Sequence, residues 1–224
     1  DSGPLTLAAG VYMLLIEGEV NETTDASYGF IINSVPQQSA GGQTTQDFDT
    51  ANLLPYTLGT VSGTAATLAA GATGNALLLT SGASGYQDNA AFFPVTQDGP
   101  LSSITIDLDM TATPASQTNR NSSIVAALLD ADTWGSSGVG PDLFTNAALA
   151  NSLGIALDVN NNYGGDGSSN HIAIRGSGGL ISQQFVTPAN ADLGSGMPVH
   201  ATITVTQVDG GANVTVVLTP QGGT

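Results

Sequence analysis

Residues 199–218 read Val-His-Ala-Thr-Ile-Thr-Val-Thr-Gln-Val-Asp-Gly-Gly-Ala-Asn-Val-Thr-Val-Val-Leu, and this stretch decides the fold class. Apolar residues such as Ile203, Val205, Val214 and Val216 alternate with threonine and other polar residues on both sides of Asp-Gly-Gly. A period of two predicts strands with one covered face. The Asp-Gly-Gly turn between the two runs predicts that they pair as an antiparallel hairpin.

Further strands of the same kind follow from the rest of the chain. Residues 104–110 also alternate, with Ile104, Ile106 and Leu108 on one side. Residues 124–129 are apolar on both sides, which predicts a central strand with two covered faces. Many short strands joined by Gly, Asn and Asp turns favour an all-β, two-sheet antiparallel sandwich. The expected core comprises Ile106, Leu108, Ile124, Ala126, Leu128, Ile155, Leu157, Ile172, Ile174, Ile203 and Val205.

The composition excludes several classes of partner. Two arginines, no lysine and 18 acidic residues give a formal net charge of −16, so binding to nucleic acids or anionic membranes is not expected. No apolar run reaches the roughly 20 residues of a membrane span, and no membrane insertion is expected. Cations and neutral sugars remain possible partners, although the acidity could serve only solubility. Cysteine is absent, which excludes disulfides and thiolate chemistry.

The N-terminal part differs from the rest and is interpreted as a separate piece. All three glutamates lie within residues 1–35, and residues 5–16 and 28–32 predict two strands of a β-hairpin. This hairpin resembles the closing hairpin of pre-peptidase C-terminal-type sandwiches of bacterial exoproteins. Residues 1–35 are therefore expected to be the tail of a preceding β-sandwich domain. Residues 36–55, rich in Gln and Gly, are interpreted as a linker, and 56–224 as the main sandwich.

Residues 151–174 carry a more specific pattern. They read Asn-Ser-Leu-Gly-Ile-Ala-Leu-Asp-Val-Asn-Asn-Asn-Tyr-Gly-Gly-Asp-Gly-Ser-Ser-Asn-His-Ile-Ala-Ile. This resembles the metal-binding segment of legume-type (L-type) lectins, "N-S-x-A-V-E-F-D-T-x-x-N", a short loop, an Asp and "H-I-x-I". Asp158, Asn162, Asp166 and His171 fall on that pattern, with one loop residue fewer. The resemblance spans roughly residues 56–219 and implies a concanavalin A-like jelly roll in an extracellular or cell-surface protein.

The residues themselves fit a calcium site. Alternation directs Leu157 to the core and Asp158 to the opposite face, and a hairpin would bring Asp158 beside His171 on an exposed sheet face. The carboxylates of Asp158 and Asp166, the Asn162 amide and the Asn160 carbonyl are oxygen donors of the kind that Ca²⁺ prefers. The alternative is an Asx-rich turn whose side chains bond only their own backbone.

Two further sites implied by the lectin resemblance are incomplete. The glutamate that completes the transition-metal site in the family is Ala156 here, so Mn²⁺ or Zn²⁺ is not expected, and His171 is interpreted as bracing the loop. The sugar-binding Asp-Gly pair is replaced by Ser122 and Ser123, while Asn162 is retained. Trp134 could stack on a sugar ring or simply pack at the rim.

Catalysis is not expected. The glycanases that share this fold use Glu-x-Asp-x-x-Glu, and no glutamate follows Glu22. Asp107 and Asp109 share one strand face, but such carboxylates usually form a solvated surface, and neither histidine has a nucleophile motif nearby. The lectin resemblance, together with the oxygen donors of residues 158–166, thus implies a calcium-dependent carbohydrate-binding or adhesion module that binds glycans. The alternative is a structural, spacer or polymerising domain of a giant extracellular protein that contacts neighbouring domains of its chain.

Overall fold

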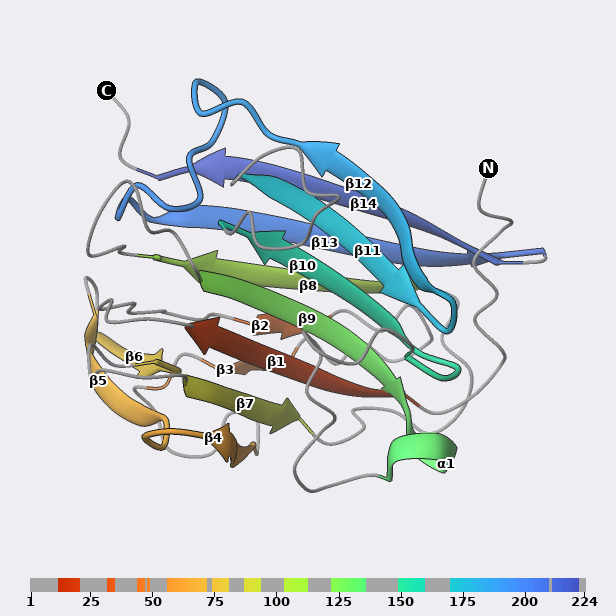
Figure 1. Ribbon diagram of the computed structural model, residues 1–224, viewed down its shortest axis with the longest axis horizontal. Helices are drawn as coiled ribbons and strands as arrows, with labels where there is room; N and C mark the ends of the chain where they lie inside the picture. Colours follow the sequence, from red (N-terminus) through yellow and green to blue (C-terminus); the bar gives the residue numbers. More distant parts are fainter. Residues whose placement is uncertain are drawn as a thin grey trace.

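The computed structural model describes residues 12–20, 32–34, 44–46, 48, 56–71, 74–80, 87–93, 103–112, 122–135, 149–159, 170–209 and 211–221. These form an all-β sandwich whose strand pairs are antiparallel (Figure 1). The seven-stranded sheet has the order β12 (Gly179–Phe185), β11 (His171–Gly176), β10 (Leu153–Asp158), β9 (Ser122–Asp130), β1 (Tyr12–Val20), β7 (Gln87–Phe93) and β4 (Thr57–Ser62).

The second sheet has five strands, in the order β14 (Gly211–Pro220), β13 (Val199–Val208), β8 (Ser103–Met110), β2 (Ile32–Ser34) and β3 (Thr44–Gln46). A separate hairpin joins β5 (Thr67–Gly71) to β6 (Gly74–Leu78). Within the described residues, the only helix is α1 (Ala131–Trp134). No helix in this part of the chain is long and apolar enough to cross a membrane.

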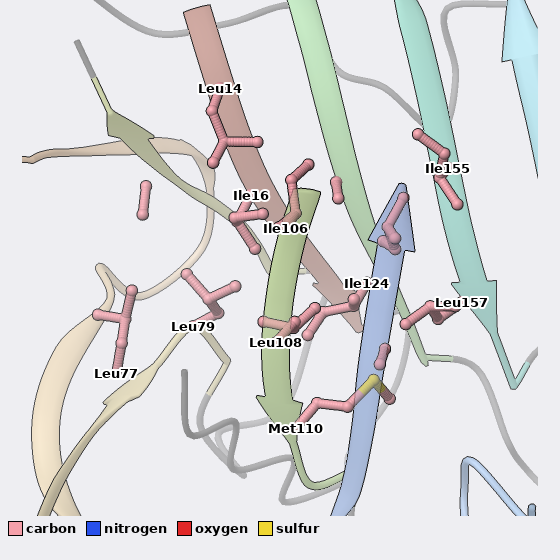
Figure 2. Close-up of a cluster of buried hydrophobic side chains, with 14 of the residues drawn as sticks. Leu14, Ile16, Leu77, Leu79, Ile106, Leu108, Met110, Ile124, Ile155 and Leu157 are labelled. Carbon is pink, nitrogen blue, oxygen red and sulfur yellow. The ribbon is translucent and has the colours of Figure 1, made fainter. Parts of the chain in front are cut away.

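The main core lies between the two large sheets. Leu14, Ile16 and Ile124 from the seven-stranded sheet belong to one buried cluster with Ile106 and Leu108 from the five-stranded sheet (Figure 2). The core predicted from the sequence is confirmed. Nine of its eleven residues are buried in this cluster, and the remaining two, Ile172 and Ile174, are partly buried and packed against it.

The two predictions made from periodicity are also confirmed. Strands β13 and β14 form a hairpin with continuous register from Val199↔Pro220 to Val208↔Gly211. Strand β9 is central and covered on both faces. Its residues Ile124, Ala126 and Leu128 face the main core, and Val125, Ala127 and Leu129 belong to a second buried cluster.

Strand β1 is a central strand of the main sandwich, which differs from the expectation of a separate preceding domain. It pairs with β9 on one side and β7 on the other. Leu14 and Ile16 belong to the main core and Leu15 to the second cluster. Because residues 13–16 of β1 are apolar on both faces, this part of the strand gains most by lying in the middle of a sheet. The boundary placed after residue 35 therefore does not separate β1 from the sandwich.

The expected N-terminal hairpin and linker also differ from the structure. Strand β2 pairs with β3 and β8 in the five-stranded sheet, so β1 and β2 lie in different sheets and are not hairpin partners. Within the expected linker, residues 44–46 form β3, and Phe48 is buried with its ring edge-on to Tyr56 at 5.4 Å. A buried aromatic ring ties this segment to the core, which a sequence rich in Gln and Gly does not suggest.

Candidate functional site

A row of polar residues crosses the seven-stranded sheet on its outer face, the face turned away from the five-stranded sheet. Asp158 on β10 lies directly opposite His171 on β11 and opposite Ser123 on β9. Residues opposite each other in antiparallel strands share one face. That face also carries Ala156 and Ala173 of the second buried cluster. We call Ser123, Asp158 and His171 the polar row.

The polar row is tightly packed and buried. Ser123 Oγ donates a hydrogen bond of 2.6 Å to Asp158 Oδ1, and His171 Nε2 lies 3.6 Å from Asp158 Oδ2. His171 is 0% exposed and Asp158 4%. The sequence predicts correctly that the β10–β11 hairpin brings Asp158 and His171 together. The expectation of an exposed face is wrong, because both faces of β10 are covered.

The described residues supply only part of the predicted calcium site. Asp158 and His171 stand at the two ends of the segment that joins β10 to β11. Asn160, Asn162 and Asp166 lie outside the described residues, so the structure does not test their contribution. Within the described ranges, no group of three or more His, Cys, Asp or Glu side chains is arranged to hold a metal ion.

Asn170, which the sequence analysis did not identify, fixes the chain next to His171. Its Nδ2 donates to the carbonyls of Val186 at 2.8 Å and Ala191 at 2.7 Å, and its Oδ1 accepts from Leu193 N at 3.0 Å. The Asn170 side chain thus ties the start of β11 to the loop after β12. Phe185, the last residue of β12, contacts the His171 ring edge-on at 6.5 Å.

The outer face of the seven-stranded sheet carries two further carboxylates that the sequence analysis did not identify. Glu17 on β1 shares the face of Leu15, and Asp88 on β7 shares the face of Ala90 and Phe92, all members of the second cluster. Glu17 and Asp88 are both 0% exposed. Burying a carboxylate costs several kcal/mol unless hydrogen bonds or opposite charges compensate for the lost water. Glu17 and Asp88 therefore differ from the solvated carboxylates that are usual on a sheet surface. A sequence signal existed, because Glu17 directly follows the apolar run of residues 13–16 within β1.

The residues predicted for sugar binding are not brought to one place by the described structure. Trp134 Nε1 donates to the Ala150 carbonyl at 3.1 Å, and its half-buried ring packs against the second cluster. Trp134 follows the C-terminal end of β9, whereas Ser123, which pairs with Asp158, lies near the N-terminal end of that strand. Trp134 therefore lies at the far end of the sheet from Asp158 (Figure 1). The side chain of Ser122 and all of Asn162 lie outside the described residues.

A second polar cluster lies on the outer face of the five-stranded sheet. His200 Nδ1 lies 2.8 Å from Asp109 Oδ1, and Thr202 Oγ1 donates to Asp107 Oδ1 at 2.7 Å. Gln221 Nε2 also donates to Asp109 Oδ1, at 2.7 Å. Thr202 Oγ1 is 3.2 Å from His200 Nε2, but its single proton goes to Asp107. This arrangement is a cross-strand hydrogen-bond network on a partly exposed surface.

The fold defines the chain as an antiparallel all-β sandwich with a buried polar row on one outer face. No family model matches the sequence, and neither a curated protein nor a solved structure matches it.

Proposed function

We propose that this chain is a non-catalytic, calcium-dependent carbohydrate-binding or adhesion module of a secreted or cell-surface protein, with a concanavalin A-like jelly-roll topology. The observation that carries the proposal is the position of Asp158. Its buried carboxylate lies opposite His171 at the base of the segment that holds Asn160, Asn162 and Asp166.

The chemistry of these residues fits a calcium ion. Asp158 already has Oδ1 fixed by the Ser123 hydroxyl, so its orientation is set without the ion. Asp158, Asn160, Asn162 and Asp166 would hold Ca²⁺ through carboxylate, amide and main-chain oxygens. The bound ion would neutralise buried negative charge and hold the loop in one conformation. Asn162 would then be placed to hydrogen-bond sugar hydroxyls.

His171 is proposed as a bracing residue, because imidazole nitrogen is a poor ligand for Ca²⁺. Its fully buried ring lies between the Asp158 carboxylate and the Phe185 ring. We propose no Mn²⁺ or Zn²⁺ site, because Ala156 occupies the position from which the lectins supply an additional carboxylate.

The absence of catalysis is part of the proposal and rests on access and geometry. Glu17 and Asp88 are fully buried, whereas a glycosidase presents two carboxyls to its substrate. On the other sheet, the Asp107 and Asp109 carboxylates accept hydrogen bonds from Thr202 and Gln221. Neither set offers a nucleophile and a base directed at a common point.

The second candidate is a structural or spacer module that has lost sugar binding. Ser122 favours it, because this residue stands where the lectins carry their sugar-binding carboxylate. The hydroxyl of the next residue, Ser123, donates to Asp158. In that case the polar row would only stabilise the end of the sheet.

Thermal melting with and without calcium tests the metal site. Ca²⁺ at a hundredfold excess over its dissociation constant should raise the free energy of unfolding by about 2.7 kcal/mol, and a chelator should reverse the effect. Asp158→Asn keeps the shape but removes the charge, so it should abolish the response. Asp109→Asn, on the opposite outer face, should retain it. If the wild type does not respond to Ca²⁺, the calcium proposal is wrong.

A glycan array then separates the two candidate functions. A carbohydrate-binding module should bind at least one glycan class in Ca²⁺ and lose that binding in chelator or in Asp158→Asn. Stabilisation by calcium without any glycan binding would favour the structural module.

A further inference from the structure

Phe185 stands at the edge of the seven-stranded sheet, at the end of the polar row. The register places Asp158 opposite His171 and His171 opposite Phe185, so the three side chains share the outer face of the sheet. His171 is fully buried, whereas Phe185, on the edge strand β12, is 50% exposed. Among the residues whose exposure the structure describes, Phe185 is the only exposed aromatic one. The lectin resemblance assigns no role to this position.

The Phe185 ring is held in place by its neighbours. It lies edge-on to the buried His171 ring, with 6.5 Å between the ring centroids. The next residue, Val186, is fixed at both of its main-chain groups, because Val186 N donates to the Asn170 carbonyl at 2.9 Å and the Val186 carbonyl accepts from Asn170 Nδ2 at 2.8 Å. Ordering this ring on binding a ligand would therefore cost little.

The surroundings of Phe185 are polar rather than apolar. Gln183 lies two residues earlier on the same face of β12, opposite Ala173. Ser182 and Thr187, within three residues of Phe185, are exposed. A single ring bordered by amide and hydroxyl groups differs from the contiguous apolar patch that marks a protein–protein interface. It corresponds to the mixture of aromatic and polar groups that binds small polar ligands.

We propose that Phe185 is the platform on which a neutral pyranose ring stacks. This inference rests on the proposed carbohydrate-binding function and names its ligand class and a residue that determines it. One face of a pyranose carries C–H bonds, which are attracted to the negative face of an aromatic ring. The sugar hydroxyls then point sideways toward polar side chains such as Gln183. The net charge of −16 repels uronic and sialic acids, and the proposal therefore specifies a neutral sugar.

The platform is close to the predicted calcium ligands. Strand β10 ends at Asp158 and β12 ends at Phe185, at the same end of the sheet (Figure 1). Only β11 separates the two strands, so their axes lie about 10 Å apart. Trp134, the other aromatic residue considered for stacking, lies at the far end of the sheet from Asp158. One bound oligosaccharide can therefore contact Phe185 and the calcium segment together.

Affinity electrophoresis of the full chain tests the platform. The gels contain Ca²⁺ and either a neutral polysaccharide, galactomannan or laminarin, or the anionic polygalacturonate. A neutral polysaccharide should retard the wild type, and polygalacturonate should not. Phe185→Ala should raise the dissociation constant at least about tenfold, whereas Phe185→Tyr, which keeps the ring, should stay within about threefold. The matched control is Leu180→Ala, 49% exposed on the same strand, which should bind like the wild type. Circular dichroism checks that each variant folds.

Tryptophan fluorescence tests the stacking itself. Trp134 is the only tryptophan of the chain, so Phe185→Trp adds a second indole at the proposed platform. The polysaccharide that retards the wild type should shift the emission of Phe185→Trp. It should leave the wild-type emission unchanged, because Trp134 lies at the other end of the sheet.

The outcomes separate this inference from the proposed function. A wild type that binds a neutral polysaccharide as tightly as Phe185→Ala does overturns the platform and leaves carbohydrate binding intact. A wild type that binds no polysaccharide and no arrayed glycan overturns both. Binding that survives chelator but not Phe185→Ala supports the platform and contradicts only the calcium dependence. Retardation by polygalacturonate alone overturns the choice of a neutral sugar.

Discussion

The Ser123 hydroxyl donates a 2.6 Å hydrogen bond to Asp158 Oδ1 across the β9–β10 pair. Hydrogen bonds to a carboxylate are shorter and stronger than those between neutral groups. Both residues are buried, at 5% and 4% exposure, so solvent offers little replacement for this bond. Ser123 therefore fixes the orientation of the one calcium-ligand candidate whose side chain the structure describes.

Replacing Ser123 by alanine should lower the free energy of unfolding by about 1–3 kcal/mol, because a buried carboxylate oxygen loses its donor. Urea unfolding measures the change. The control is Ser103→Ala, whose hydroxyl lies 3.3 Å from Thr206 Oγ1 at an exposed position, and which should change the free energy by no more than about 0.5 kcal/mol. Equal losses in the two variants would show that the Ser123–Asp158 bond contributes no more to the free energy of unfolding than an exposed hydroxyl contact does.

Gly18 tests whether β1 is part of the sandwich. A Cβ atom at Gly18 would lie 2.9 Å from Leu79 Cδ1 and 3.0 Å from Leu79 Cβ, and the latter atom cannot move without its backbone. Gly18→Ala should therefore destabilise the whole sandwich by about 1–3 kcal/mol through overpacking. The measurement is the midpoint and the cooperativity of urea unfolding.

The control for this prediction is Gly178→Ala, because no atom lies within 4 Å of a Cβ built there. This substitution should leave the unfolding midpoint nearly unchanged. If residues 1–35 belonged to a separate domain, Gly18→Ala would leave the unfolding of residues 56–221 unaffected, which would contradict the position of β1.

The sheets were predictable because their signals are local. The period of two in residues 104–110 and 199–218 identifies a covered face directly, and the apolar run 124–129 identifies a central strand. The same reasoning brings Asp158 and His171 together, since alternation and a hairpin suffice. These are relationships between residues close in sequence or within one strand.

The position of β1 was not predictable in this way. Its neighbours β7 and β9 lie about 70 and 110 residues further along the chain, and no local pattern identifies distant strand partners. Because residues 1–35 were assigned to another domain, Glu17 was not expected on the sheet face that carries the polar row. Burial of His171 and Asp158 was missed for a related reason, because alternation predicts only one covered face, whereas both faces of β10 are covered.

Asn170 should be important for stability although it is a single polar residue. Asn170→Ala removes two donated bonds and one accepted bond that hold the loop after β12, leaving buried backbone groups without partners. We expect a loss of about 1–3 kcal/mol in the free energy of unfolding, and faster proteolysis between residues 186 and 193. Asn190→Ala, at an exposed position of the same loop, keeps the main-chain bond from Asn190 N to the Thr187 carbonyl and should have little effect. Equal proteolysis of both variants would contradict the proposed role of Asn170.

Tyr56 should make the stability depend on alkaline pH. Its ring lies between Phe48 at 5.4 Å and Phe93 at 6.0 Å, and burial raises the pKa of its phenol above the ordinary value of 10.0. The unfolded chain therefore loses this proton at a lower pH than the folded chain. Stability is fully present below pH 10 and falls as the pH rises toward the folded-state pKa. Urea unfolding at several pH values from 8 to 11 measures this fall.

Tyr56→Phe is the matched variant, because it keeps the ring contacts and removes the titrating group. The wild type should lose free energy of unfolding more steeply than Tyr56→Phe above pH 10, while the two should show parallel behaviour below pH 9. The other four tyrosines are common to both proteins, so their titration cancels in the difference. Identical pH profiles would mean that the Tyr56 phenol is as accessible to water in the folded protein as in the unfolded chain, and Phe48 would then not cover it.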